Sequence, residues 1–190
     1  MSARTRLLLG LAGVAATASA VQRDDVGRRE VAVFRAVNGL PDLAQGPVWV
    51  VMQTGSFAAV PATACLALAT GRTRLARQLL GEGCSAWVLA KALKHGVQRP
   101  RPAALLPETR CRGRDESGLG YVSGHAAVVA ALAAAALPSL SPRGRLAALA
   151  AVPSVCLSRL YVGAHLPLDV LGGDALGVAV DAAAALGRRP

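Results

Sequence analysis

The stretch SRLYVGAHLPLD, residues 158–169, places an arginine, a histidine and an aspartate in an otherwise apolar part of the sequence. Charged and ionisable side chains are costly in such surroundings, so their presence indicates a function. Pro167 is favourable in the first turn of a helix and unfavourable inside one. The stretch therefore predicts a helix that begins near Leu166 and continues through the following segment, which is rich in Ala, Val and Leu.

This stretch also has a spacing suited to chemistry. Asp169 lies about one helical turn from His165, close enough to accept a hydrogen bond from one imidazole nitrogen while the other nitrogen faces outward. A nucleophilic or basic histidine is held in one tautomer in this way. Arg159 offers a planar fork of donors for phosphate oxygens, and the positive end of the helix points to the same place. For each residue taken alone, the alternative is a charge that only marks the end of a membrane helix.

The composition indicates an integral membrane protein. Of the 190 residues, 53% are hydrophobic and only 3% are aromatic, and the mean hydropathy is +0.42. The apolar residues suit closely packed helices, and no alternating run predicts a strand. The net charge is +10, but the basic residues are scattered between apolar segments without an aromatic-interleaved stripe. We therefore expect an all-α polytopic membrane helix bundle whose partners are lipid headgroups and an anionic substrate, and no nucleic acid.

The cysteines and histidines do not indicate a metal site or a cofactor. The four cysteines have neither the C-x-x-C spacing of a zinc site nor the pattern of a disulfide framework: Cys65, Cys84, Cys111 and Cys156. The chain has only three histidines, so we expect no dedicated metal cluster.

Six apolar segments are candidates for membrane helices. They cover residues 7–20, 47–70, 79–93, 126–140, 146–162 and 166–186. The third contains Glu82, to which the sequence assigns no role. The first ends in Ala-Ser-Ala, which resembles a signal-peptidase site. An uncleaved first helix is favoured because it gives an even number of helices, and cleavage is the alternative.

The sequence divides into an N-terminal part, residues 1–46, and a catalytic membrane domain, residues 47–190. The N-terminal part holds the first helix and a polar segment that runs from Gln22 to Gln45. We expect this polar segment to lie along the membrane surface. Its mildly amphipathic face consists of Val31, Val33, Phe34 and Val37.

Six helices place both termini on one side of the membrane. That side then carries nine arginines, namely Arg4, Arg6, Arg72, Arg74, Arg77, Arg143, Arg145, Arg188 and Arg189. They occupy the termini and the two shortest loops, which hold no acidic residue, so we expect this side to face the cytoplasm from the plasma membrane. The stretches 94–125 and 158–169 then share the opposite, extracytoplasmic face.

A second stretch, KHGVQRPRP at residues 94–102, closes the third segment with a cluster of cations. Snorkelling basic residues that anchor a helix end are the alternative interpretation. Against it, the two prolines fix the backbone around Arg99 and Arg101. A rigid cationic cradle of this kind is suited to a phosphate dianion.

A third stretch, YVSGH at residues 121–125, opens the fourth segment. Ser123 is a candidate N-cap, and Gly124 lets the backbone approach a ligand closely with its N–H groups exposed. His125 would then lie at the rim of the same pocket. Serine and glycine before a helix are ordinary capping residues, so the functional interpretation depends on the combination of the three stretches.

Together and in this order, the three stretches resemble the type 2 phosphatidic acid phosphatase superfamily, which also contains glucose-6-phosphatase and the vanadium haloperoxidases. Its first motif, a lysine followed after six residues by Arg-Pro, is matched by Lys94 and Arg101-Pro102. Its second motif, Pro-Ser-Gly-His, is matched by residues 123–125, with Val122 where the family usually has proline. Its third motif is matched in full by Ser158, Arg159, His165 and Asp169.

The resemblance implies a two-step phosphoryl transfer without a metal. His165 attacks phosphorus to form a phosphohistidine, Asp169 orients its imidazole, and His125 protonates the leaving oxygen. The residues that hold the phosphate oxygens are Lys94, Arg101, Ser123, Gly124 and Arg159. Arg99 matches no residue that the family requires, and we expect it only to assist the phosphate.

The expected substrate is a membrane lipid whose phosphate reaches the site while its tail stays in the bilayer. Candidates are an isoprenyl diphosphate such as undecaprenyl diphosphate, phosphatidic acid and phosphatidylglycerol phosphate, which the motifs do not separate. A lipid-to-lipid phosphotransferase would use the same residues. A membrane scaffold or transporter part that only binds anions is an alternative from another class, and a basic nucleic-acid-associated protein is a third. The sequence does not indicate an oligomeric state.

Overall fold

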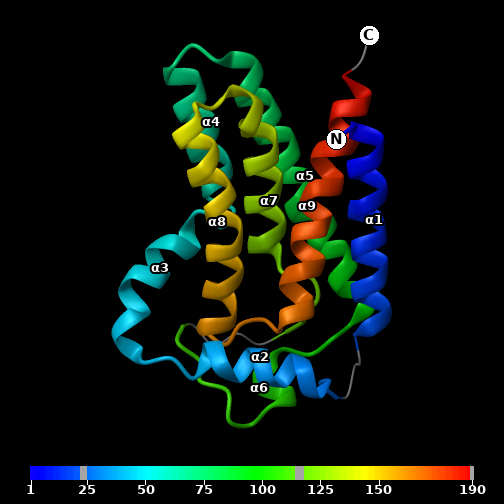
Figure 1. Ribbon diagram of the computed structural model, residues 1–190, viewed down its shortest axis with the longest axis vertical. Helices are drawn as coiled ribbons and strands as arrows, with labels where there is room; N and C mark the ends of the chain where they lie inside the picture. The colour runs from blue at the N-terminus through cyan, green and yellow to red at the C-terminus, as the bar shows by residue number, and fades with distance from the viewer. Residues whose placement is uncertain (22–24, 114–117, 189–190) are drawn as a thin grey trace.

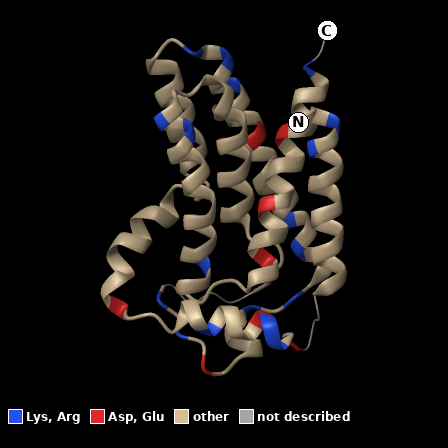
Figure 2. Cartoon of the chain, in the orientation of Figure 1, with Lys and Arg blue, Asp and Glu red and all other residues tan. Residues whose placement is uncertain are grey.

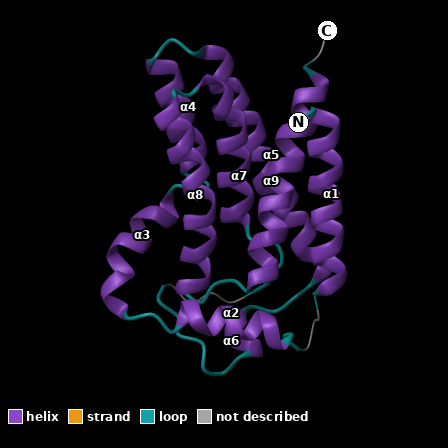
Figure 3. Ribbon diagram, in the orientation of Figure 1, coloured by secondary structure: helices purple, strands orange, loops and turns teal. Residues whose placement is uncertain are grey.

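The computed structural model describes residues 1–21, 25–113 and 118–188. Gln22 and Arg189, named above, lie outside these ranges. The described part is all-helical, as predicted, and its one β-type feature is an isolated bridge between Pro100 and Leu119. Figure 3 shows helices and loops only. The α-helices are α1 (Ala3–Ala20), α2 (Arg28–Asn38), α3 (Gln45–Gln53), α4 (Ala59–Ala69), α5 (Thr73–Val97), α6 (Pro102–Leu105), α7 (Gly124–Ala136), α8 (Pro142–Tyr161) and α9 (Pro167–Gly187).

The long helices stand side by side, and the short helices α2 and α6 lie across one end of them (Figure 1). Both termini, the α4–α5 loop and the α7–α8 connection lie at the other end. Basic residues occur at both ends of the bundle (Figure 2). The end of α5, the beginning of α7 and the α8–α9 turn, which carry the three motif stretches, lie at the end that α2 covers. This confirms that the 94–125 and 158–169 stretches share one end.

Helix α9 lies between α1 and α7 and is packed closely against both. A Cβ atom placed on Gly173 would lie 2.4 Å from the Ser123 carbonyl oxygen, and one on Gly177 would lie 2.4 Å from that of Ala127. On the other face, a Cβ on Gly10 of α1 would lie 2.8 Å from the Ala175 carbonyl oxygen. Small residues allow backbones to approach in this way, as they do between membrane helices. The close packing fixes the beginning of α9 relative to the beginning of α7.

The prediction of one continuous helix over residues 47–70 is wrong. The segment forms α3 and α4, which are separated by residues 54–58. The Thr54 and Ser56 hydroxyl groups donate to the carbonyl oxygens of Val51 and Gln53, and these bonds compete with continuation of the helix. Gly55 also packs so closely on α7 that a Cβ would lie 2.7 Å from the His125 carbonyl oxygen. The break therefore lets the chain pass next to the motif residues.

The other helix boundaries differ from the prediction by smaller amounts. Helix α5 spans 25 residues and extends into the basic flanks on both sides of the predicted 79–93 segment. Helix α7 ends at Ala136 rather than at residue 140, because a 3-10 turn, Leu137–Ser139, contains Pro138. Helix α9 begins at Pro167 with Leu166 as its N-cap, as predicted.

One described helix, Pro167–Gly187, is long and apolar enough to cross a membrane by length and composition. Two shorter apolar helical segments are Ala59–Ala69 and Gly124–Ser139. Large apolar side chains are exposed on the outside of several long helices, among them Leu8, Leu9, Leu146, Leu149, Leu157 and Leu171. Six crossings remain a prediction.

The amphipathic helix α2 covers the end of the bundle. Phe34 is buried, at 1% exposure, in a cluster that includes Leu166 and Val170 of the third motif region. Val31 and Val37 pack against this cluster, whereas Val33 is half exposed. The apolar face predicted to lie on the membrane is thus largely used inside the protein, and α2 becomes part of the surroundings of the motifs.

Candidate active site

Hydrogen bonds, two between backbone groups and two from the Lys94 side chain, join the three motif stretches to one another. The Ser123 N–H donates to the Asp169 carbonyl oxygen at 2.8 Å, which connects the second motif to the third. The Gly120 N–H donates to the Arg99 carbonyl oxygen at 2.7 Å. The Lys94 ammonium, in the last turn of α5, donates to the carbonyl oxygens of Leu119 and Gly120, at 2.9 Å each. The first motif is thereby connected to the second.

His165 lies in the turn between α8 and α9 and is 2% exposed. The Arg159 carbonyl oxygen accepts the N–H groups of Ala164 and His165, and Gly163 takes a positive φ of 77° that lets the chain turn there. This turn places the imidazole directly before the first turn of α9. Its location agrees with the prediction.

Asp169 is fully buried beside His165, but the predicted hydrogen bond between them is not formed. The Asp169 Oδ2 atom lies 3.6 Å from the His165 Nδ1 atom, beyond hydrogen-bond distance. The same oxygen accepts the Leu166 N–H at 2.8 Å, because Asp169 is the third residue of α9 and caps its N-terminus. The His165 Nδ1 atom has no hydrogen-bond partner in the described part of the chain. The carboxylate is therefore adjacent to the imidazole and fixed by the helix cap.

The surroundings of His165 favour its neutral form. Burial is the largest cause that lowers the imidazole pKa well below 6.5, and the nearby cations Lys94, Arg159 and Arg101 lower it further. His125 acts in the same direction. Three of the residues predicted to bind phosphate thus act electrostatically on this imidazole. A neutral imidazole has a lone pair available for attack on phosphorus.

The two arginines of the site are held from different sides. The Arg101 guanidinium donates to the Ala164 carbonyl oxygen at 3.3 Å, next to His165. Burial and the neighbouring Arg159 lower the pKa of Arg101, so the two guanidinium groups are close to each other. Arg159 is 4% exposed, and its Nη1 atom contacts the Met52 sulfur at 2.9 Å. Two neighbouring guanidinium groups offer several N–H donors that suit the oxygens of a phosphate group.

The beginning of α7 is the third part of the site. Ser123 is the N-cap, with its hydroxyl oxygen 3.4 Å from the Ala126 nitrogen, and the peptide bond between Tyr121 and Val122 is cis. A Cβ on Gly124 would meet no atom within 4 Å, so there is open space beside this backbone. The first N–H groups of a helix have no partner within it and suit an anion. His125 follows in the same turn.

Arg99 does not serve as the further phosphate cation that the sequence suggested. Its side chain is fully buried, and its Nη1 atom donates to Asp169 Oδ1 at 2.9 Å and to Glu30 Oε1 at 3.0 Å. Its Nη2 atom donates to Glu30 Oε2 at 2.7 Å. These two carboxylates outweigh the effect of burial and raise the pKa of Arg99. Arg99 thus connects Asp169 to helix α2.

The sequence analysis missed two polar residues of α2 that support the site. The Glu30 carboxylate binds Arg99 and also accepts the Leu168 N–H at 2.9 Å. The buried Asn38 amide donates to the carbonyl oxygens of Leu160 and Tyr161, at the end of α8. Glu30 and Asn38 are four residues before and after Phe34, on the same face of the helix. Polar residues on the otherwise apolar face of an amphipathic helix were the signal available in the sequence.

Among residues 1–21, 25–113 and 118–188, no group of three or more His, Cys, Asp or Glu side chains could hold a metal ion. What the site does contain is a neutral histidine, a second histidine, three cations and a helix N-terminus around one place. This arrangement can bind a tetrahedral anion and offer it a nucleophile and a proton donor.

Comparisons with known proteins agree with this geometry. The family model described as the PAP2 superfamily matches residues 75–189. The solved structure of LpxE from Aquifex aeolicus superposes with a TM-score of 0.78 at 20% identity, covering 88% of this chain and 99% of that one. A transmembrane PAP2 type phosphatidylglycerolphosphate phosphatase from Bacillus subtilis superposes with a TM-score of 0.76 at 19% identity, covering 97% and 98%. No curated protein matches the sequence significantly.

Proposed function

Because the chain belongs to the PAP2 superfamily, we propose that it is an integral membrane lipid phosphatase that uses His165 as its nucleophile. The substrate is a phosphomonoester or diphosphate of a membrane lipid. The observation that carries the proposal is the neutral, buried His165 imidazole with Lys94, Arg101 and Arg159 around it. Neutral histidine supplies the electron pair, and the cations stabilise the charge of the transferred phosphoryl group.

In the first step, the His165 Nε2 lone pair forms a bond to phosphorus while the bond from phosphorus to the leaving oxygen breaks. His125 donates a proton to that oxygen, so the lipid alcohol or lipid monophosphate leaves uncharged at that atom. Asp169, next to Nδ1, stabilises the positive charge that develops on the imidazole. The equatorial oxygens are held by Lys94, Arg101, Arg159, the Ser123 hydroxyl and the Gly124 N–H.

In the second step, water attacks the phosphohistidine. His125, now lacking its proton, takes one from the water as the new oxygen–phosphorus bond forms. The phosphorus–nitrogen bond breaks, and its electron pair returns to His165. Inorganic phosphate leaves, and both histidines regain their starting states. All positive charge in this scheme comes from protein side chains, so no metal is required.

A lipid substrate is supported by the surroundings of the site and by the similar structures. A largely apolar cavity of about 380 Å³ lies between α2, α8 and α9, and its lining includes Leu160, Pro167, Val170 and Leu171 from the ends of α8 and α9 that flank the turn with His165. One similar structure is described as a phosphatidylglycerolphosphate phosphatase. The candidate substrates are undecaprenyl diphosphate or another isoprenyl diphosphate, phosphatidic acid and phosphatidylglycerol phosphate.

We propose a multi-pass protein of the plasma membrane with its active site on the extracytoplasmic face. The proposal is supported by the short loops at the opposite end of the bundle, which are basic and hold no acidic residue. Retention of the first helix is supported by its contacts. The Tyr121 hydroxyl donates to the Val14 carbonyl oxygen at 2.9 Å, and Arg6 forms an ion pair with Asp181.

The test is phosphate release by the detergent-purified protein in EDTA, from undecaprenyl diphosphate, phosphatidic acid and phosphatidylglycerol phosphate. The wild type is compared with His165→Ala and with His95→Ala, which removes an exposed histidine outside the site. We expect release that survives EDTA, is abolished in His165→Ala and is unchanged in His95→Ala. The preferred lipid identifies the substrate.

Two other outcomes would contradict the proposal. Phosphate transfer to a second lipid without release would indicate a phosphotransferase that uses the same residues. Anion binding without turnover of any of the three lipids, unaffected by His165→Ala, would indicate a membrane protein that only binds anions.

A further inference from the structure

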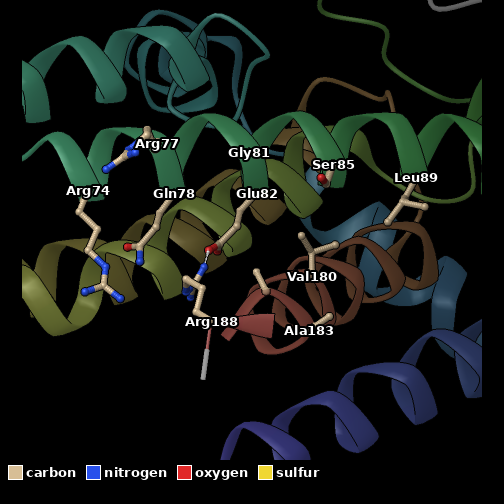
Figure 4. Close-up of a pocket in the computed structure, with 11 residues that line it drawn as sticks. Arg74, Arg77, Gln78, Gly81, Glu82, Ser85, Leu89, Val180, Ala183 and Arg188 are labelled. Atoms are coloured by element: carbon tan, nitrogen blue, oxygen red, sulfur yellow. Dashed lines mark hydrogen bonds and ion pairs between the residues drawn. The ribbon is translucent and has the colours of Figure 1, made fainter. Parts of the chain in front are cut away.

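A large cavity lies at the end of the bundle opposite to His165. It has a volume of about 900 Å³ and lies between α5 and α9. Figure 4 shows Arg74, Arg77, Glu82 and Arg188 at one part of it and Leu89 and Val180 at another. The cavity therefore has a charged part and an apolar part. No step of the proposed reaction uses these residues.

The charged part has an excess of positive charge. Arg188 and the buried Glu82 form an ion pair at 2.5 Å, which neutralises both. Neither the Arg74 side chain nor the Arg77 side chain forms an ion pair or a hydrogen bond with another residue in the described ranges, and both residues are exposed. These two guanidinium groups lie three residues apart on α5, so they are on the same face of the helix. Together they are suited to one phosphate group.

A second cavity, of about 670 Å³, adjoins the first and shares Arg74, Gln78 and Arg188 with it. It adds Arg6, Arg72 and Asp181 to the lining, and Arg6 is paired with Asp181. The two cavities thus contain five arginines and two carboxylates, a surplus of three positive charges. A bound anion would compensate part of this charge.

The residues along α5 change from cationic to apolar in one direction. Arg74 and Arg77 are followed on the same face by Gly81, Ser85 and Leu89, toward the middle of the bundle. At 1.5 Å per residue, residues 74–89 extend over about 22 Å, which is comparable to a headgroup with an acyl chain. A Cβ on Gly81 would meet no atom within 4 Å, so the groove is open there. A small soluble anion would occupy only the charged part.

We propose that this cavity binds an anionic phospholipid, with the phosphodiester at Arg74 and Arg77 and one acyl chain along Gly81, Ser85 and Leu89. In the orientation proposed above, the lipid belongs to the inner leaflet, opposite to the substrate. The Glu82–Arg188 pair connects α5 to the end of α9 and so forms the wall behind the headgroup. The site requires only the membrane bundle and is independent of the chemistry at His165.

The test is native mass spectrometry of the detergent-purified full-length protein. It is titrated with phosphatidylglycerol, a phosphodiester that the proposed reaction does not consume, and with phosphatidylcholine and inorganic phosphate. Arg74→Gln/Arg77→Gln removes the two unpaired cations. Arg4→Gln/Arg143→Gln removes two exposed arginines from the same end that line neither cavity. Thermal unfolding without lipid checks that both double variants are folded.

We expect one phosphatidylglycerol to bind more tightly than phosphatidylcholine. This preference should fall about 30-fold in Arg74→Gln/Arg77→Gln, because each arginine near a membrane surface contributes about 1 kcal/mol, which is about fivefold in affinity. The Arg4→Gln/Arg143→Gln variant should keep it. Equal binding of the two lipids, or equal loss in both variants, would overturn the proposal. Binding of inorganic phosphate that prevents lipid binding would show a site for a free anion instead.

Discussion

Replacement of Glu30 by glutamine should impair catalysis from a helix that carries none of the family motifs. The Glu30 carboxylate accepts two hydrogen bonds from Arg99, whose other acceptor is Asp169 beside His165. Arg99 is fully buried and the Glu30 side chain is 8% exposed, so water cannot replace a lost partner easily. We therefore infer that Glu30 is a positioning residue that acts on His165 through Arg99 and Asp169.

The magnitude follows from these contacts. In Glu30→Gln, the amide oxygen can still accept from Arg99 Nη1 and from the Leu168 N–H, but the amide nitrogen then faces Arg99 Nη2. One buried donor of a charged group loses its acceptor, which costs about 1–3 kcal/mol. In a chain of this size, that corresponds to a fall of about 2–12 °C in Tm. We also expect Asp169 to move toward Arg99 in this variant, and a displacement of about 1 Å from the imidazole lowers kcat by up to about 100-fold.

The assay measures Tm, kcat and KM of the purified protein with the lipid phosphate that the proposed panel identifies. We expect kcat to fall and KM to change little, because the hydrogen bonds of the Glu30 carboxylate go to Arg99 and Leu168 and not to the residues proposed to bind phosphate. The control is Glu108→Gln, which breaks an exposed ion pair with Arg35 and should change neither Tm nor kcat. An unchanged kcat in Glu30→Gln, or equal effects in both variants, would refute the positioning role.

Three further predictions concern the imidazole and the glycines. Because the pKa of His165 is lowered in the folded protein, the unfolded chain binds a proton below pH 6.5 that the folded chain does not. The Tm of the wild type should therefore fall relative to that of His165→Gln as pH is lowered from 7 to 5. A constant difference in Tm between the two proteins over this pH range would contradict the prediction. Gly124→Ala should leave Tm unchanged, since its Cβ meets no atom, but raise KM by placing a methyl group where the phosphate binds. Gly173→Ala should cost about 1–3 kcal/mol in denaturant unfolding because its Cβ would lie 2.4 Å from the Ser123 carbonyl oxygen, whereas Gly187→Ala should be neutral.

The motif residues were predictable because local geometry determines most of their arrangement. Pro167 begins a helix for stereochemical reasons, and this places Asp169 one turn after His165 without any tertiary information. Ser123 is an N-cap for a similar reason. The convergence of the stretches required only that they lie at one end of a helical bundle. The contact between Asp169 and His165 was predicted as a hydrogen bond, but the cap at Leu166 holds the carboxylate at 3.6 Å.

The parts that the sequence did not predict depend on contacts between distant segments. The break between α3 and α4 lies where Gly55 packs closely on α7. The average hydropathy of residues 47–70 contains no information about this contact. Arg99 and Arg101 are both followed by proline and look equivalent in the sequence. Only the fold shows that Arg99 pairs with two carboxylates, whereas Arg101 lies near Arg159. Their roles differ because α2 brings Glu30 to Arg99.

The dependence of the site on the first 46 residues extends beyond Glu30. The match to the family model begins at residue 75, but helices α1 and α2 contact the catalytic end directly. The Val14 carbonyl oxygen accepts from Tyr121, two residues before Ser123, and Asn38 binds the carbonyl oxygens at the end of α8. A polypeptide that began at residue 47 would leave Arg99 without Glu30 and the Tyr121 hydroxyl without the Val14 carbonyl oxygen, at a cost of about 1–3 kcal/mol for each buried group that loses its partner. The motifs supply the reacting groups, and the N-terminal helices hold them in position.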